Sequence, residues 1–288
     1  FVVLYLANAG QMLVDPRVFA WGAPWQAVCA ALGFLVVGWL LYDAACRVFG
    51  TARDGAVLTA SAVIVAVAAV LACQLFAGRA AFVVVAAMIA TWMTANVAHW
   101  IIPGQRKVIA SMRAGQAPDP IHGQRGKQRS VHNTWFGLPV LIGMLSNHYG
   151  MLWQHPHNWA VLLVLMAAGV AIRIFFVQRH KGVSNWGAVV AALGLLAGLV
   201  VWLAPKPVAA VAAPVSTAQV LAIAQQRCVV CHGEALAQKG VRLDSLEALE
   251  QHRAQIHQQV VVQRVMPLNN ATGLTDDERA LIARWTTP

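Results

Sequence analysis

Charged side chains are scarce in this sequence. Asp, Glu, Lys and Arg together make up 11% of its 288 residues, whereas hydrophobic residues make up 59%. The mean hydropathy of +0.60 is strongly positive. Such a shortage of charge argues against a wholly water-soluble protein. The composition therefore predicts a membrane protein.

Acidic residues are especially rare in the apolar part of the chain. Up to Ser216 there are 14 Lys and Arg against 4 acids, and from Thr217 onward there are 7 against 7. The net charge of +10 therefore lies before Ser216, most densely over 103–133. Under the positive-inside rule, 103–133 is a cytoplasmic loop and everything after residue 204 lies outside. The basic residues are thus mostly topology signals, which argues against nucleic-acid binding.

Long apolar runs dominate the first 204 residues. Crossing about 30 Å of hydrocarbon requires about 20 helical residues. A run over 131–152 is long enough but contains Pro139, Asn147 and His148, and we count it as a sixth span. The sequence therefore predicts an all-α fold with a polytopic transmembrane helix bundle over 1–204. The five other spans are expected at 25–46, 56–76, 80–102, 157–178 and 186–204.

The opening stretch FVVLYLANAGQML lacks an initiator methionine, a basic segment and the length to cross a bilayer. It has the character of the second half of a severed helix. We therefore expect a truncated first helix here, with further chain upstream.

Bulky side chains disappear at Pro205. The stretch PKPVAAVAAPVS contains three prolines and predicts an extended linker over 205–216. A small α-helical domain is expected over 217–288, with helices over STAQVLAIAQQRC and TDDERALIARW. In the second helix Thr275 and Glu278 have the spacing of a capping box. So small a domain buries little apolar surface, and we expect a cofactor or cross-link to stabilise it.

The motif CVVCH opens this C-terminal domain. Its spacing is typical of covalent haem c attachment, in which Cys228 and Cys231 bind the haem vinyl groups and His232 is the proximal iron ligand. A zinc site would need a second pair of ligands, and a thioredoxin-like disulfide would need a βαβ setting. The domain lacks both. A cytochrome c domain on the outer side of the membrane is therefore the preferred interpretation.

A sixth iron ligand is expected at a distance from the motif. Met266 is the only methionine of the domain and is followed by Pro267. A thioether ligand raises the reduction potential, as suits an electron acceptor. His252 and His257 remain alternative ligands. The other three cysteines are expected to be buried, inert thiols in or near the spans; they are Cys29, Cys46 and Cys73.

Polar residues inside the spans are candidates for function because burying them in lipid is costly. Asn96 and His99 lie three residues apart and should share a helix face near the inner end of their span. His132 begins the next span at the same end, and His148 lies near its outer end. For each histidine alone, a hydrogen bond between helices explains its presence as well as a ligand or catalytic role does.

Four stretches together resemble a known family: IIPGQRKVIASMRAGQAPDP, GKQRSVHN, LPVLIGMLSNHY and IRIFFVQRHKG, followed by the cytochrome c motif. They are similar to the bacterial membrane-bound urate hydroxylases, also called cytochrome c urate oxidases. The resemblance implies a membrane domain of about eight helices that oxidises urate to 5-hydroxyisourate. It also implies that the electrons pass to the fused cytochrome c and not to O₂. This chain would lack the first helix and half of the second.

The resemblance implies a bacterial inner-membrane protein with its cytochrome c domain in the periplasm. A soluble cytochrome or terminal oxidase would then take the electrons onward. Urate is an anion, so its site needs cations or hydrogen-bond donors, and a base must help water attack. Binding near His99 and His132 would require a relay across the membrane, such as a haem b. Binding near His148 would not.

Two other functions remain open from the sequence. One is a membrane-anchored electron carrier, supplied by quinol or by a partner complex. It needs only one anchoring helix, so six spans with polar residues inside them count against it. The other is a transporter or sensor regulated by haem, for which internal repeats would be expected, and the sequence has none.

Overall fold

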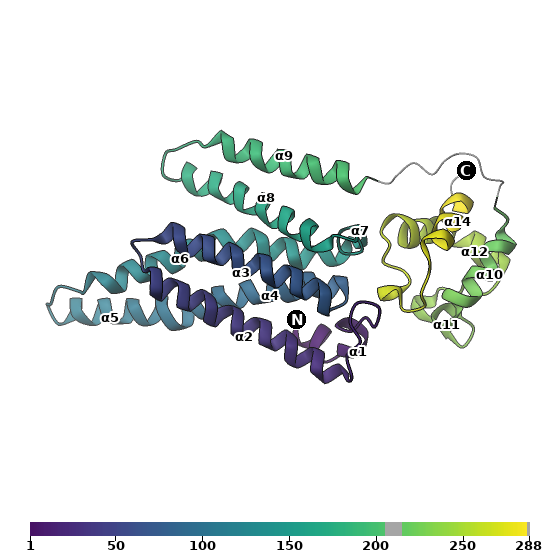
Figure 1. The fold of residues 1–288 in the computed structure, drawn as a ribbon, viewed down its shortest axis with the longest axis horizontal. Helices are drawn as coiled ribbons and strands as arrows, with labels where there is room; N and C mark the ends of the chain where they lie inside the picture. Colours follow the sequence, from purple (N-terminus) through teal and green to yellow (C-terminus); the bar gives the residue numbers. More distant parts are fainter. Residues whose placement is uncertain (205–214, 287–288) are drawn as a thin grey trace. The chain divides into compact units, whose positions relative to one another are not determined.

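A computed structural model describes residues 1–204 and 215–286 (Figure 1). The described chain is mostly helical, as the sequence predicts, and its one strand is the two-residue β1, Leu236–Ala237. It divides into two compact units. The first comprises Phe1–Asn147 and His155–Trp202, and the second comprises His148–Gln154 and Leu203–Pro288. The predicted linker 205–216 falls largely outside the described residues.

Five helical stretches are long and apolar enough to cross a membrane, so the protein is a multi-pass membrane protein. Four of them agree with the predicted spans to within a few residues. The fifth, predicted at 80–102, is much longer in the structure. The stretches are α2 (Pro24–Phe49), α3 (Asp54–Leu75), the long stretch Gly78–Arg113, α8 (Asn158–Arg179) and α9 (Trp186–Leu203).

The prediction of a loop over 103–133 is wrong for its first part, because the helical stretch Gly78–Arg113 continues into it. Helix α4 (Gly78–Asn96) continues through a π-helical turn, η2 (Val97–Ile101), into α5 (Ile102–Arg113). Its 36 residues would span ~54 Å, well beyond the hydrocarbon layer. The charged residues of α5 do not break the helix, because Arg, Lys and Gln are good helix formers. Their polarity predicts a loop only if a helix has to end where the hydrocarbon ends, and this helix does not.

Helix α6 (Pro120–Leu145) is the second arm of this hairpin and corrects the predicted span 131–152. It begins earlier because Asp119 caps it, accepting a hydrogen bond from the Ile121 amide at 2.9 Å. Its first half is too polar for a membrane span, but its second half packs against the bundle. There Gly143 permits close approach, since a Cβ would lie 2.5 Å from that of Ala86. The helix ends at Leu145, before Asn147 and His148.

The N-terminal segment forms short turns and not the continuous half-helix expected from the sequence. It contains η1 (Val2–Leu6) and α1 (Ala9–Met12). The Ala77 amide donates to the Leu13 carbonyl at 2.8 Å, and the Trp21 indole donates to the Leu75 carbonyl at 2.9 Å. These bonds hold the segment against the start of α4. Of the three cysteines expected to be buried, only Cys46 is; Cys29 is exposed and Cys73 partly so.

The C-terminal unit confirms both predicted helices. α10 (Thr217–Arg227) and α14 (Asp276–Thr286) pack around a core that includes Leu249 and Trp285. The predicted capping box is present, with hydrogen bonds of 2.8 and 3.1 Å between Thr275 and Glu278. Short helices complete the unit: α11 (Val229–His232), α12 (Leu246–Gln251), α13 (Arg253–Ile256), η4 (Gln238–Gly240), η5 (His257–Val262) and η6 (Leu268–Asn270).

Candidate functional site

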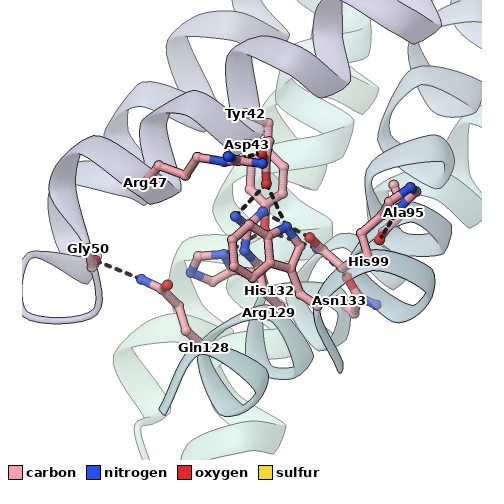
Figure 2. Close-up of polar contacts among 12 residues, drawn as sticks. Tyr42, Asp43, Arg47, Gly50, Ala95, His99, Gln128, Arg129, His132 and Asn133 are labelled. Atoms are coloured by element: carbon pink, nitrogen blue, oxygen red, sulfur yellow. Dashed lines mark hydrogen bonds and ion pairs between the residues drawn. The ribbon is translucent and has the colours of Figure 1, made fainter. Parts of the chain in front are cut away.

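A buried polar network joins α2, α3, α4 and α6 at the basic end of the bundle (Figure 2). On α6 the contributing residues follow helical spacing, so they line one face of that helix. Most members are less than 10% exposed, which is unusual for polar side chains in an apolar bundle. The core of the network is Tyr42, Asp43, Asn96, Arg129 and His132.

An ion pair between Arg129 and Asp43 anchors the network. The guanidinium lies 2.7 Å from the carboxylate, and the two side chains are only 3% and 6% exposed. Asp43 also accepts from Arg47 at 2.6 Å and from the Trp100 indole at 2.7 Å. Arg129 lies over the rings of Tyr42 and Trp100, at 5.1 and 4.9 Å. A buried ion pair is stable only when its remaining hydrogen-bonding groups are satisfied, and here they are.

Asn96 links the ion pair to the rest of the network. Its Oδ1 accepts from Arg129 at 3.0 Å. Its Nδ2 donates to the Tyr42 hydroxyl at 3.1 Å and to Asn133 Oδ1 at 2.9 Å. The Arg129 guanidinium can only donate, so the orientation of the Asn96 amide is fixed.

Tyr42, His132 and Asp54 form a chain that leads from the buried core to the surface. The Tyr42 hydroxyl lies 2.8 Å from His132 Nδ1, and His132 Nε2 lies 2.9 Å from Asp54 Oδ1. An ionised carboxylate only accepts, so Nε2 carries the hydrogen and Nδ1 accepts from the tyrosine. The His132 side chain is fully buried, whereas that of Asp54 is 41% exposed. This chain can pass a proton between a buried hydroxyl and a surface carboxylate.

Two of the four predicted membrane candidates come together, and two do not. Asn96 and His132 belong to the network. His99 does not share the face of Asn96: it is exposed, and its Nδ1 contacts the Ala95 carbonyl at 3.1 Å (Figure 2). Its ring lies against Trp39. The π-helical turn η2 changes the helical register between the two residues. A spacing of three residues predicts a shared face only in a regular α-helix.

His148 is also separate from the network. It lies in the short helix η3 (Ser146–His148), after the end of α6, and is exposed. From His132 to Leu145 the helix advances 13 residues, or about 20 Å. The four residues therefore do not form one site.

Sequence reasoning missed Tyr42, Asp43 and Arg129. Arg129 was interpreted as one more topology signal among the basic residues of its segment. The available signal was Asp43, an acid within an apolar stretch, since an ionisable residue inside a span demands a partner.

The opposite end of the bundle holds a second, smaller polar cluster. The Tyr5 hydroxyl donates to Asn147 Oδ1 at 2.5 Å. Arg79 lies in the first turn of α4 and donates to the Met12 sulfur at 3.1 Å. Its Nε is buried and has no hydrogen-bond partner among the described residues. This cluster, unlike the network, is not internally satisfied.

An open groove of about 640 Å³ separates α5 from α6. Its polar lining consists of Gln105, His122, Lys127 and Ser130. Gln105, Lys127 and Ser130 are exposed, as expected for side chains solvated by water. The groove therefore resembles an ordinary solvated surface more than a prearranged site.

The CVVCH motif lies in the C-terminal unit, on and just before α11. His232 Nδ1 lies 3.1 Å from the Val241 carbonyl, which can only accept. Nδ1 therefore carries the hydrogen, and the lone pair of Nε2 is left for a metal. Burial, with smaller effects of Cys231 and Glu278, raises the pKa of the Cys228 thiol to about 11. A redox-active CxxC motif needs a thiol with a lowered pKa, and burial shifts the pKa of Cys228 in the opposite direction.

The predicted distal ligand, Met266, is partly buried and packs against the core of this unit. The alternative ligands have other contacts: His252 Nδ1 lies 2.9 Å from Gln255, and His257 Nδ1 lies 2.7 Å from Thr286. Among the described residues, no group of three or more His, Cys, Asp or Glu side chains is placed to hold a metal ion. One histidine and one methionine on a haem iron would not form such a group.

Residues 1–204 match the family described as urate oxidase N-terminal. The chain belongs to this family. Membership supports a urate-related oxidoreductase, and it covers both polar clusters of the bundle but not the CVVCH unit. No curated protein and no solved structure matches the chain significantly.

Proposed function

We propose that the membrane domain oxidises urate to 5-hydroxyisourate and passes the electrons to a haem c in the C-terminal unit. In this reaction the oxygen of water bonds to urate, and two electrons and two protons leave. The observation that carries the proposal is the union, in one chain, of a urate oxidase N-terminal domain with a CVVCH motif. The electrons then have an acceptor on the same polypeptide.

The residues of the C-terminal unit fit a covalent haem c. Cys228 and Cys231 would hold its vinyl groups, His232 Nε2 would bind the iron, and Met266 would supply the second axial ligand. The bond from His232 Nδ1 to the Val241 carbonyl supports this assignment, because it fixes the ring and its tautomer. The haem would accept one electron at a time, so each urate requires two transfers.

Of the predicted candidates, neither His132 nor His99 is arranged to hold a haem b. Both ring nitrogens of His132 are engaged, one by Tyr42 and the other by Asp54. His99 is exposed and contacts its own helix. A haem b held between two helices would need a free ring nitrogen from each. We therefore assign no electron transfer to a second haem.

The proposed location is the bacterial inner membrane, with the C-terminal unit in the periplasm. The basic residues of α5 and α6 would then face the cytoplasm, as the positive-inside rule requires. A soluble cytochrome or terminal oxidase would take the electrons from the haem. The alternative function, a membrane-anchored carrier supplied by quinol, has no comparable support from family membership.

Anaerobic addition of urate to oxidised, detergent-purified full-length protein tests the proposal. The reduced-haem absorption bands should rise, and hydrogen peroxide should not accumulate in air. Met266→Ala should lower the reduction potential and remove the sulfur-to-iron band, whereas Cys228→Ala with Cys231→Ala should leave the protein without bound haem. Reduction by a quinol but not by urate would reject the proposal in favour of the carrier.

A further inference from the structure

Arg79 is the one charged side chain of the described residues with a buried nitrogen that lacks a hydrogen-bond partner. Within these residues no carboxylate lies within ion-pair distance of it, and its Nη2 donates only to the Met12 sulfur, at 3.1 Å. A thioether is a weak acceptor. A partly buried cation without a counter-ion is costly, so such a group requires an explanation, of which a missing anion is the simplest.

Three arginines of the bundle have the carboxylate partner that Arg79 lacks. Arg129 and Arg47 both bind Asp43, at 2.7 and 2.6 Å. Arg17, near the same end as Arg79, binds Asp15 at 2.6 Å. Each of these charges has a carboxylate partner, and Arg173 on α8 at least donates to the Thr134 carbonyl at 2.7 Å. Arg79 differs from them because its buried Nε has no hydrogen-bond partner among the described residues.

Tyr5 and Asn147, at the same end of the bundle as Arg79, offer hydrogen-bonding groups. The Tyr5 hydroxyl is held by Asn147 Oδ1 at 2.5 Å. Asn147 Nδ2 has only a long contact, 3.4 Å, to the Met144 carbonyl, so it can donate elsewhere. A guanidinium suits a flat, delocalised anion that accepts along one edge, and the Asn147 amide at the same end of the bundle can add a donor.

We infer that Arg79 anchors the urate anion, with Asn147 as a second donor. The inference rests on the proposed function and names the binding site for its substrate. The network at the other end is about 26 Å away along α4, from residue 79 to residue 96.

Arg79→Gln and Arg79→Lys in the full-length haem-loaded protein test the inference. Equilibrium dialysis with labelled urate measures binding, and anaerobic haem reduction measures KM and the maximal rate. Arg79→Gln should weaken urate binding at least about tenfold, the typical loss for a hydrogen bond to a charged group. Arg79→Lys should weaken urate binding less, because lysine keeps the positive charge but cannot donate two parallel hydrogen bonds as a guanidinium does. Reduction by dithionite should be unchanged in both.

Arg17→Gln is the matched control, because its charge is already paired and its loss should leave urate binding unchanged. Equal binding by Arg79→Gln and the parent protein would overturn the inference, as would weaker binding in Lys127→Gln but not in Arg79→Gln. Urate binding that depends on Arg79 without any haem reduction would uphold the inference and reject the electron transfer to haem. Failure of the parent protein to retain urate would reject both.

Discussion

The two ends of the membrane bundle each place an arginine among apolar helices, and they treat it in opposite ways. At the basic end Arg129 is 2% exposed and has Asp43, Asn96 and two aromatic rings as partners. At the other end Arg79 contacts a methionine sulfur and has a buried nitrogen that finds no partner in the described part of the chain. The same side chain thus belongs to a complete set of interactions at one end and an incomplete set at the other.

This difference separates scaffold from binding site. Groups that satisfy one another need nothing from outside, and a ligand could enter the network around Arg129 only by displacing existing bonds. Groups left unsatisfied after folding are the ones that a ligand can stabilise. The network therefore holds α2, α4 and α6 together, whereas the Arg79 cluster is suited to bind an anion.

The largest expected effect comes from breaking the network at its ion pair. Asp43→Asn leaves Arg129 buried without a counter-charge, which should cost about 3–5 kcal/mol of stability. The matched change at the other end, Asp15→Asn, removes a partner from the half-exposed Arg17 and should cost less than about 1 kcal/mol. Thermal unfolding in detergent, followed by tryptophan fluorescence, measures both. Equal losses of stability in the two variants would mean that the burial of the arginine does not determine how much its ion pair contributes.

A second change at the ion pair sharpens the interpretation of the first. Replacing both partners, Asp43→Leu with Arg129→Met, removes the uncompensated charge and should recover part of the loss. A double variant less stable than Asp43→Asn would indicate that Arg129 stabilises the bundle through its contacts with Tyr42 and Trp100 and not through its charge.

An intermediate effect is expected from the two histidines that sequence spacing placed together. His132→Ala removes the acceptor of the buried Tyr42 hydroxyl and should cost about 2 kcal/mol. His99→Ala removes an exposed ring and should change stability by less than about 0.5 kcal/mol. The same unfolding measurement applies. A loss for His99→Ala as large as that for His132→Ala would contradict the separation of the two residues.

Hydropathy predicted the positions of the spans well, because a membrane imposes length and composition on each helix alone. The same logic misplaced the α5–α6 hairpin, since a helix need not end where the hydrocarbon ends. The predicted shared face of Asn96 and His99 was wrong because a π-helical turn, invisible to spacing rules, lies between them.

The network and the Arg79 cluster lay beyond sequence reasoning for a different reason. Asp43 and Arg129 are 86 residues apart, and nothing in the spacing of either helix says that α2 and α6 are neighbours. For Arg79 the decisive property is the absence of a partner, which only the complete set of neighbours can reveal. The haem c ligands remain a prediction of the motif, to which the structure adds the tautomer of His232.

The smallest expected effect comes from Tyr5→Phe, at the end of the bundle that holds Arg79. Its hydroxyl donates to Asn147, which is partly exposed, so water can replace the lost bond and the cost should be below about 1 kcal/mol. Because the Arg79 guanidinium remains, urate affinity should fall no more than about threefold, against about tenfold for Arg79→Gln. Tyr42→Phe, in the network, should leave urate affinity unchanged in the same dialysis. If Tyr5→Phe lost as much affinity as Arg79→Gln, the hydroxyl and not the guanidinium would anchor the anion, and the contrast between the two arginines would no longer mark the binding site.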